Sequence, residues 1–181
     1  MNSEAPIIRQ ARSGEADLLR DLALRVKLLR GQARGCTEEV RDGECPTETQ
    51  IRSEYMRVFV LEKGGSVMGF HVLKFQSRHE IELAALFVEP ADFGKGSWQL
   101  LLNHAKSTAA QLGAERLLFS EADPNTVAQF VNAGATFLGL CESTKKAGQT
   151  FASFKLDLSA ALLHNQRLQD DYSSATHFRS A

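Results

Sequence analysis

The sequence is poor in the features that tie a chain to a membrane or to nucleic acid. No apolar run approaches the ~20 residues that span a bilayer, and the N-terminal MNSEAPIIRQ lacks the basic segment and long apolar core of a secretion signal. The formal net charge is −1, and no basic stripe is present that would hold nucleic acid. We therefore expect no membrane and no nucleic acid among its partners.

Cysteine is scarce as well. Cys36, Cys45 and Cys141 are odd in number and irregularly spaced, which argues against a disulfide framework and against a zinc site. We expect reduced thiols, no bound metal and a cytoplasmic location.

The chain does have enough apolar material for one core. Of its 181 residues 43% are hydrophobic, which suits a single domain. Residues 159–181 are polar apart from 160–163. We expect one domain over 1–158 and a C-terminal extension over 159–181, helical or disordered.

Hydrophobic periodicity divides the domain into strands and helices. Ser13 is a predicted helix cap, and 31–46 is either a loop or a loosely formed helix. The strands are predicted at 6–10, 57–61, 67–75, 80–88, 116–120, 135–140 and 150–158, and the helices at 13–31, 47–55, 96–112 and 124–133. The predicted apolar face of the first helix is Leu18, Leu22, Val26 and Leu29, and that of the third is Trp98, Leu102, Ala105, Ala109 and Leu112.

This order of elements predicts the fold class. Three strands in a meander, followed by a βαβ crossover, give an α/β (α+β) fold with a mixed, mostly antiparallel central sheet of about six to seven strands and helices on both faces. Ligands of such sheets bind beyond the carboxyl end of a central strand, where the next helix begins.

The sequence at that point is FVEPADFGKGSW, residues 87–98. Gly94 and Gly96 precede a helix, whose first N–H groups are unpaired and bind phosphate oxygens. A P-loop would need Gly in place of Glu89, and a Rossmann loop would need a small residue in place of Gln99. On its own the glycine pair marks either a phosphate loop or only a turn.

Two segments add context: LFVEPADFGKGSWQLLLNHA and EADPNTVAQFVNAGATFLG. Together they resemble the GCN5-related N-acetyltransferase (GNAT) superfamily, whose members acetylate amines with acetyl-CoA. The resemblance covers 7–158. It implies the GNAT fold, acetyl-CoA or coenzyme A as cofactor and an amine as substrate. The implied cofactor-binding residues are Leu86, Phe87, Val88, Phe93, Gly94, Lys95, Gly96, Ser97, Trp98, Asn125 and Phe130.

The chain departs from the family pattern in its cofactor loop. Phe93 stands where relatives carry Gln or Arg, and Trp98 where they carry a small residue. Trp98 either packs on the sheet or crowds the cofactor. Phe130 replaces a tyrosine that protonates the leaving thiolate in many relatives, and phenylalanine has no proton to give.

The strand before the loop departs as well. Close relatives read ELEHLFV where this chain reads ELAALFV, so a glutamate and a histidine fall on Ala84 and Ala85. Glu82 is the remaining candidate base. The strand period would place it on one side with Leu86 and Val88, whose N–H groups would polarise the thioester carbonyl. Glu82 would act through a water; otherwise it is a solvated or ion-paired strand residue.

His71 and His104 are candidates because an unperturbed histidine titrates near neutral pH, and each is either catalytic or structural. Two functions follow from these residues. The chain is an acetyl-CoA-dependent N-acetyltransferase for a primary amine of a small molecule or peptide, or it is a catalytically impaired domain that binds acyl-CoA or a protein. A homodimer stays open, because 159–181 could dock on a neighbouring chain.

Overall fold

The computed structural model describes residues 5–29, 45–121, 124–142 and 150–158. It has a mixed α/β fold with seven mostly antiparallel strands, which confirms the predicted class. The chain divides into two compact units, Met1–Ser77 with Ile81–Lys106 and Arg78–Glu80 with Ser107–Ala181. The predicted loop at 31–46 lies almost wholly outside the described residues, and the predicted extension at 159–181 lies wholly outside them.

The first unit is built on antiparallel strands β1 (Ile7–Gln10), β2 (Met56–Lys63), β3 (Ser66–Phe75) and β4 (Glu80–Val88), paired in that order. Val60 lies opposite Phe70, and Phe70 opposite Phe87. These apolar residues therefore share one face of the sheet, because cross-strand neighbours point the same way.

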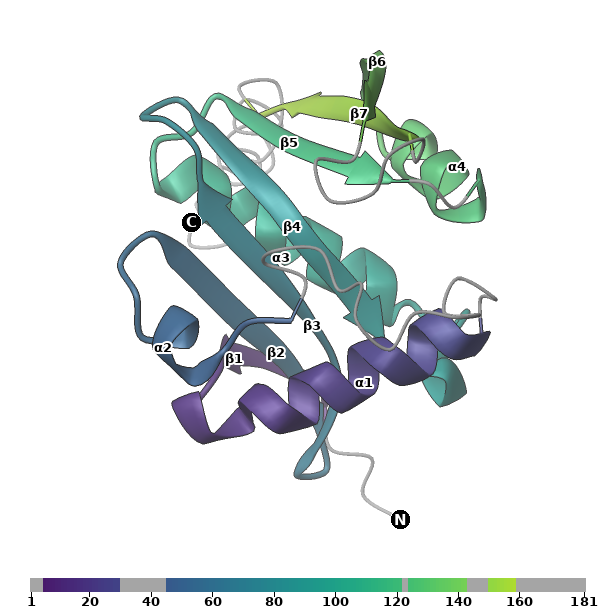
Figure 1. The fold of residues 1–181 in the computed structure, drawn as a ribbon. Coiled ribbons are helices and arrows are strands. Elements are labelled where there is room, and N and C mark those ends of the chain that lie inside the picture. Colours follow the sequence, from purple (N-terminus) through teal and green to yellow (C-terminus); the bar gives the residue numbers. More distant parts are fainter. Residues whose placement is uncertain (1–4, 30–44, 122–123, 143–149, 159–181) are drawn as a thin grey trace, which may run out of the picture. The chain divides into compact units, whose positions relative to one another are not determined.

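Helices cover both faces of this unit's strands, as predicted. A short 3₁₀ turn, η1 (Ser13–Glu15), leads into α1 (Ala16–Leu29), and α2 (Glu48–Ile51) precedes β2. A second turn, η2 (Pro90–Asp92), leads into α3 (Ser97–Gln111). In Figure 1, α1 crosses in front of these strands and α3 runs behind them. The face of these strands that α1 covers, called the α1 face below, holds a core cluster. It includes Leu19, Leu22, Ala23, Val26, Val58, Val60, Phe70 and Val72. A second cluster joins Leu101 of α3 to Leu61 and Val88.

The predicted helical faces were partly wrong. Leu18 and Leu29 are exposed, at 44% and 69%, whereas Leu19 is fully buried. Leu101 of α3 is buried, whereas Leu112, which directly follows the end of α3, is 42% exposed. Each helix has adjacent apolar residues that allow two overlapping stripes at the same period, and contact with the sheet selects one of them.

Two predicted helix boundaries also differ. The cap of the first helical segment is Arg12 rather than Ser13, and Glu15 accepts a hydrogen bond from the Arg12 N–H at 2.7 Å. Helix α2 ends at Ile51, well before Tyr55. Its cap is Thr47, whose side chain accepts from the Gln50 N–H.

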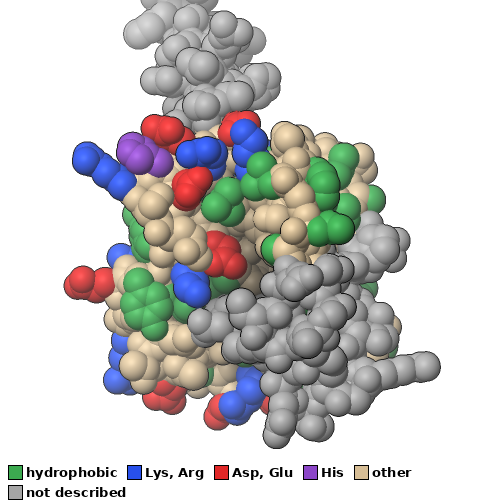
Figure 2. All heavy atoms as spheres, turned by 45° about the horizontal axis from the view of Figure 1, so that its top comes forward, with side chains coloured by type: hydrophobic (Ala, Val, Ile, Leu, Met, Phe, Trp, Pro, Cys, Tyr) green, Lys and Arg blue, Asp and Glu red, His purple; other side chains and the backbone are tan. Residues whose placement is uncertain are grey.

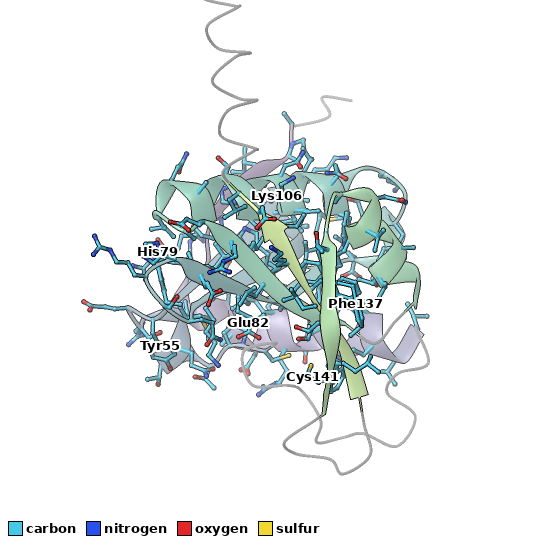
Figure 3. All side chains as sticks on the ribbon, turned by 90° about the horizontal axis from the view of Figure 1, so that it is seen from above. Tyr55, His79, Glu82, Lys106, Phe137 and Cys141 are labelled. Atoms are coloured by element: carbon cyan, nitrogen blue, oxygen red, sulfur yellow. The ribbon has the colours of Figure 1, made fainter. Side chains whose placement is uncertain are left out.

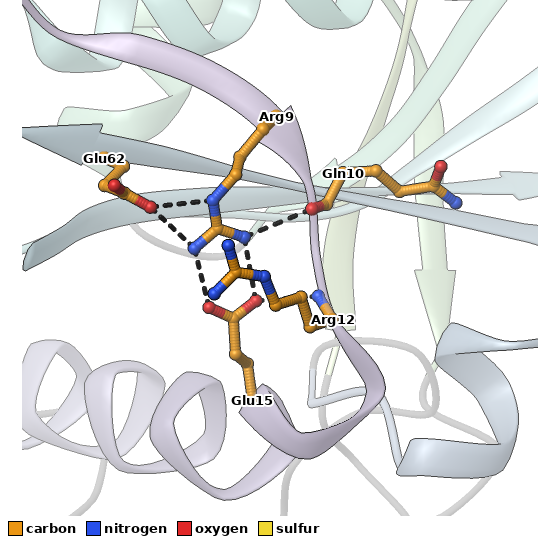
Figure 4. A network of polar contacts seen from close by, with 5 residues as sticks. All are labelled: Arg9, Gln10, Arg12, Glu15 and Glu62. Carbon is orange, nitrogen blue, oxygen red and sulfur yellow. Dashed lines mark hydrogen bonds and ion pairs between the residues drawn. The ribbon is translucent and has the colours of Figure 1, made fainter. Parts of the chain in front are cut away.

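A charged network fastens β1 to η1 and β2. Arg9 donates from Nε to Glu62 at 2.7 Å, and from its two Nη atoms to Glu15 at 3.0 and 2.7 Å (Figure 4). Hydrogen bonding to Arg9 is the largest cause that lowers the pKa of Glu15. The network therefore holds Glu15 ionised and ties the chain's first strand to its neighbours.

The second unit contains antiparallel strands β5 (Arg116–Glu121), β7 (Thr150–Asp157) and β6 (Thr136–Glu142), in that order, with α4 (Pro124–Asn132) between β5 and β6. Phe130 of α4 stacks on Phe119 with ring centroids 3.8 Å apart. Charges in this unit pair locally, as Arg116 does with Glu80 at 3.2 Å. Acidic and basic side chains are interspersed on the face shown in Figure 2.

No helix in the described part of the chain is both long enough and apolar enough to cross a membrane. Cys141 is a free thiol, and Cys36 lies outside the described residues.

Candidate functional site

The segment between β4 and α3 forms an exposed glycine loop, as predicted. Gly94 and Gly96 have φ angles of +75° and +88°, a region that residues with a Cβ rarely adopt. A Cβ at either position would meet no other heavy atom within 4 Å. The backbone conformation therefore requires these glycines. The first helical hydrogen bond after these glycines runs from the Leu100 N–H to the Gly96 carbonyl. The N–H groups of the first turn of α3 therefore have no carbonyl of their own helix to bind.

A buried carboxylate lies inside this loop. Asp92 is 4% exposed, and its Oδ2 accepts a hydrogen bond from the hydroxyl of Ser97, which is also buried. Lys95 Nζ lies 3.9 Å from Asp92 Oδ1. Asp92 was not among the site residues predicted from the sequence. An acidic residue two positions after Pro90 was a visible signal, but its burial was not.

The aromatic residues of the loop behave differently from each other. Phe93 is 44% exposed and adds no polar group to the loop. Trp98 is partly buried and packs against the cluster of Leu61, Val88 and Leu101. Trp98 therefore has packing contacts with the sheet and with α3.

Strand β4 contains a bulge just before the loop. Val72 pairs with Ala85 but Leu73 pairs with Leu83, so Ala84 is the extra residue. A bulge interrupts the alternation of side chains. Leu86 and Val88 pack with the α3 cluster, whereas Ala84 and Ala85 pack with the α1 cluster.

The bulge corrects the predicted orientation of Glu82. Its cross-strand partner is Lys74, which shares the face of Val72 by the strand period, so Glu82 lies on the α1 face. Leu86 and Val88 point to the other face. Glu82, labelled in Figure 3, is half-buried. It accepts a hydrogen bond from the Gln76 amide.

The two candidate histidines form a pair on the α3 side of the first unit. His71 Nε2 lies 2.9 Å from His104 Nδ1, and the ring of Phe59 stacks on His71. His71 is fully buried, and burial lowers its pKa to about 3, with a smaller contribution from the charge of His104. Burial also lowers the pKa of His104. Both histidines are therefore neutral at pH 7.

The structure brings most of the predicted cofactor residues into one unit. Leu86, Phe87 and Val88 end β4, and residues 93–98 follow them in the loop and the start of α3. Phe130 and Asn125 belong to α4 in the second unit. Phe130 is buried in that unit's aromatic stack, and the side chain of Asn125 lies outside the described residues. Within the described ranges, no group of three or more His, Cys, Asp or Glu could hold a metal ion.

Comparison with known proteins agrees with this arrangement. The model of the acetyltransferase (GNAT) family matches residues 27–131. Among solved structures, an acetyltransferase of the GNAT family from Desulfovibrio desulfuricans has a TM-score of 0.69 at 14% identity, covering 85% of this chain and 99% of that one. N-acetylglutamate synthase from Neisseria gonorrhoeae, complexed with coenzyme A and N-acetyl-glutamate, has a TM-score of 0.65 at 23% identity, covering 87% of this chain and 36% of that one.

A third structure is the ribosomal-protein-S18-alanine N-acetyltransferase from Escherichia coli, with a TM-score of 0.65 at 14% identity, covering 85% of this chain and 94% of that one. No curated protein matches the chain. The strands, the helices and the loop between β4 and α3 define an acetyltransferase-like α/β protein. The chain belongs to the acetyltransferase (GNAT) family, because the family match covers more than half of its residues.

Proposed function

We propose that this protein is an acetyl-CoA-dependent N-acetyltransferase that acts on a primary amine of a small molecule or peptide. The observation that carries the proposal is the loop from β4 to α3. Its two glycines hold positive φ angles directly before the N-terminus of a 15-residue helix. N–H groups at such a position bind diphosphate oxygens, and the helix dipole adds to the attraction.

The residues of the loop fit the diphosphate of coenzyme A. Of its two acidic side chains, Asp92 is turned inward and bonded to Ser97. Glu89 is half-buried and paired with Arg25 at 2.9 Å. The exposed positions are Ala91, Phe93, Gly94, Lys95 and Gly96, so these positions carry a cation and no anion. The loop N–H groups, with Lys95, would hold the two phosphates. Trp98 would pack beneath them rather than bind them.

When bound, acetyl-CoA supplies a thioester that an amine can attack directly. The protein's part is then to deprotonate the amine and to polarise the carbonyl. A lysine-like amine has a pKa of about 10.4 and is mostly protonated at neutral pH, so it needs a base. Glu82 is our candidate, acting through a water from the α1 face of β4. The N–H groups of Leu86 and Val88, just after the bulge, would polarise the carbonyl.

A second function is favoured by specific residues. Ala84 and Ala85 offer no acid or base at the bulge, and Phe130 carries no hydroxyl. A domain with these residues could bind acyl-CoA without turning it over. General acids and bases contribute about 10²–10⁴-fold to a rate, so slow turnover and its complete loss are both compatible with these replacements.

Calorimetric titration with coenzyme A and with acetyl-CoA tests the binding step. Gly94→Ala places a Cβ at φ +75°, and Gly65→Ala is its matched control, at φ +76° in the β2–β3 turn, with open space around both. Both variants should lose about 1–2 kcal/mol of stability, since a left-handed conformation costs that much with a Cβ. Only Gly94→Ala should weaken coenzyme A binding, by tenfold or more.

The other outcomes discriminate between the functions. No binding by the native protein or by Trp98→Gly would refute the coenzyme site. Binding by Trp98→Gly alone would make Trp98 a plug and refute the enzymatic proposal. Binding by the native protein, without acetyl transfer in a screen of amines, would favour the acyl-CoA-binding function. With turnover, Glu82→Gln should lower kcat at neutral pH by 10²-fold or more, because the base is removed.

A further inference from the structure

The loop between β4 and α3 is organised around Asp92. A carboxylate is rarely buried unless it is paired, yet Asp92 is 4% exposed while the four residues after it are all exposed. Its own N–H donates to the Glu89 carbonyl at 2.8 Å, and its carbonyl accepts from the Lys95 N–H at 3.2 Å. Its carboxylate accepts from the Ser97 hydroxyl. One residue thus binds the end of β4, the middle of the loop and the start of α3.

The bond from Ser97 to Asp92 spans both glycines. Glycine loses more conformational freedom on ordering than any other residue, and Gly94 and Gly96 are the most flexible links between η2 and α3. Among the described contacts, the Asp92 carboxylate is the side-chain group that joins the two ends of this flexible stretch. A loop held in this way loses little further conformational entropy when a ligand binds. The free energy of binding is more favourable by the entropy cost that is avoided.

We propose that Asp92 is the positioning residue of the coenzyme loop, and that its hydrogen bond with Ser97 presets the glycine backbone for a diphosphate. This inference rests on the proposed function. Asp92 is not itself a binding group, because it is buried and carries the same sign of charge as the ligand.

The charge of Asp92 and its hydrogen bond to Ser97 have opposite expected effects on the binding of a diphosphate. The carboxylate complements the positive end of the α3 dipole, and a diphosphate brings further negative charge to the same place. Lys95 Nζ, at 3.9 Å, offsets part of the repulsion. Asparagine keeps an oxygen that accepts from Ser97 and removes the charge. Alanine removes both. The two variants therefore separate positioning from electrostatics.

The test is the affinity of coenzyme A for the full-length native protein and four variants, measured by calorimetry at fixed salt. Asp92→Ala and Ser97→Ala remove the same hydrogen bond from opposite ends, and each should weaken binding by tenfold or more. The double variant should bind coenzyme A no more weakly than either single variant, because both substitutions remove the same hydrogen bond. Asp92→Asn should bind as tightly as the native protein or a few-fold more tightly.

Amide hydrogen exchange, measured without ligand, provides a second readout. The amides of residues 93–99 should exchange faster in Asp92→Ala than in the native protein and at native rates in Asp92→Asn. If Asp92→Ala does not fold, Ser97→Ala carries the same prediction. Native affinity in both alanine variants, or equal loss in Asp92→Ala and Asp92→Asn, would overturn the proposal while leaving the coenzyme site intact. Absence of coenzyme A binding in the native protein would overturn both.

Discussion

The buried histidine pair predicts a specific loss of stability at mildly acidic pH. His71 is fully buried between β2, β3 and α3, and its Nδ1 has no hydrogen-bond partner among the described residues. Its Nε2 faces His104 Nδ1 at 2.9 Å. A neutral pair needs one proton between these two atoms. The arrangement that leaves no buried N–H unpaired has His71 donate from Nε2, since the alternative puts the proton on the unpartnered Nδ1.

The sign and size of the effect follow from linkage. The folded pKa of His71, about 3, lies below the value of about 6.5 for an unfolded histidine. The unfolded state therefore binds more protons below pH 6.5. The stability from a neutral His71 is fully present above that pH and declines as the pH falls toward 3. Between pH 7 and pH 5 the loss is about 2 kcal/mol. His104, whose pKa is also lowered, acts in the same direction.

Urea unfolding of the native protein and of His71→Phe, each at pH 7 and pH 5, measures this loss. Phenylalanine keeps a ring against Phe59 and cannot be protonated. The native protein should lose about 2 kcal/mol more than the variant over this range, and the carboxylates that also begin to titrate are common to both and cancel. Equal losses in the two proteins would refute the reasoning.

Three further predictions concern packing and charge in the first unit. Gly69→Ala should lower the free energy of unfolding by about 1–3 kcal/mol, because its Cβ would lie 2.7 Å from a β4 carbonyl oxygen. Its control, Gly14→Ala, has open space around the added Cβ and should not destabilise the fold in the same urea assay. Arg9→Met should lower the free energy of unfolding by about 2–3 kcal/mol, since two partly buried carboxylates lose their partner. Arg20→Met removes an exposed ion pair and should change the free energy of unfolding by less than about 1 kcal/mol. Trp98→Ala should lower the free energy of unfolding by about 2 kcal/mol and leave the coenzyme A affinity, measured by calorimetry, within threefold of the native value. A larger change in affinity would mean that the indole contacts the ligand.

Periodicity in the sequence was sufficient to locate the long strands and helices, although not every boundary. The predicted strand at 80–88 coincides with β4, and the predicted helix at 96–112 differs from α3 by one residue at each end. These elements have strong local signals, since strand and helix periods differ and Pro90 and Gly113 mark their ends. The resemblance to the GNAT family, carried by the same segments, was confirmed by the family match.

The sequence could not determine which side chains share a face after a bulge. Glu82 and Leu86 are four residues apart on one strand, and an unbroken period would place them together. The extra residue at Ala84 separates them. Whether a strand bulges depends on its neighbour β3, and residues so distant in sequence leave no local signal.

The sequence alone thus determined the order of elements, the glycine loop and the family, because these depend on residues close together in the chain. Only the tertiary structure decided that Asp92 is buried and bonded to Ser97, that His71 meets His104, and that Glu82 lies on the α1 face of β4. Burial and pairing arise when distant segments pack against one another. The pKa of His71 and the expected roles of Asp92 and Glu82 depend on those contacts.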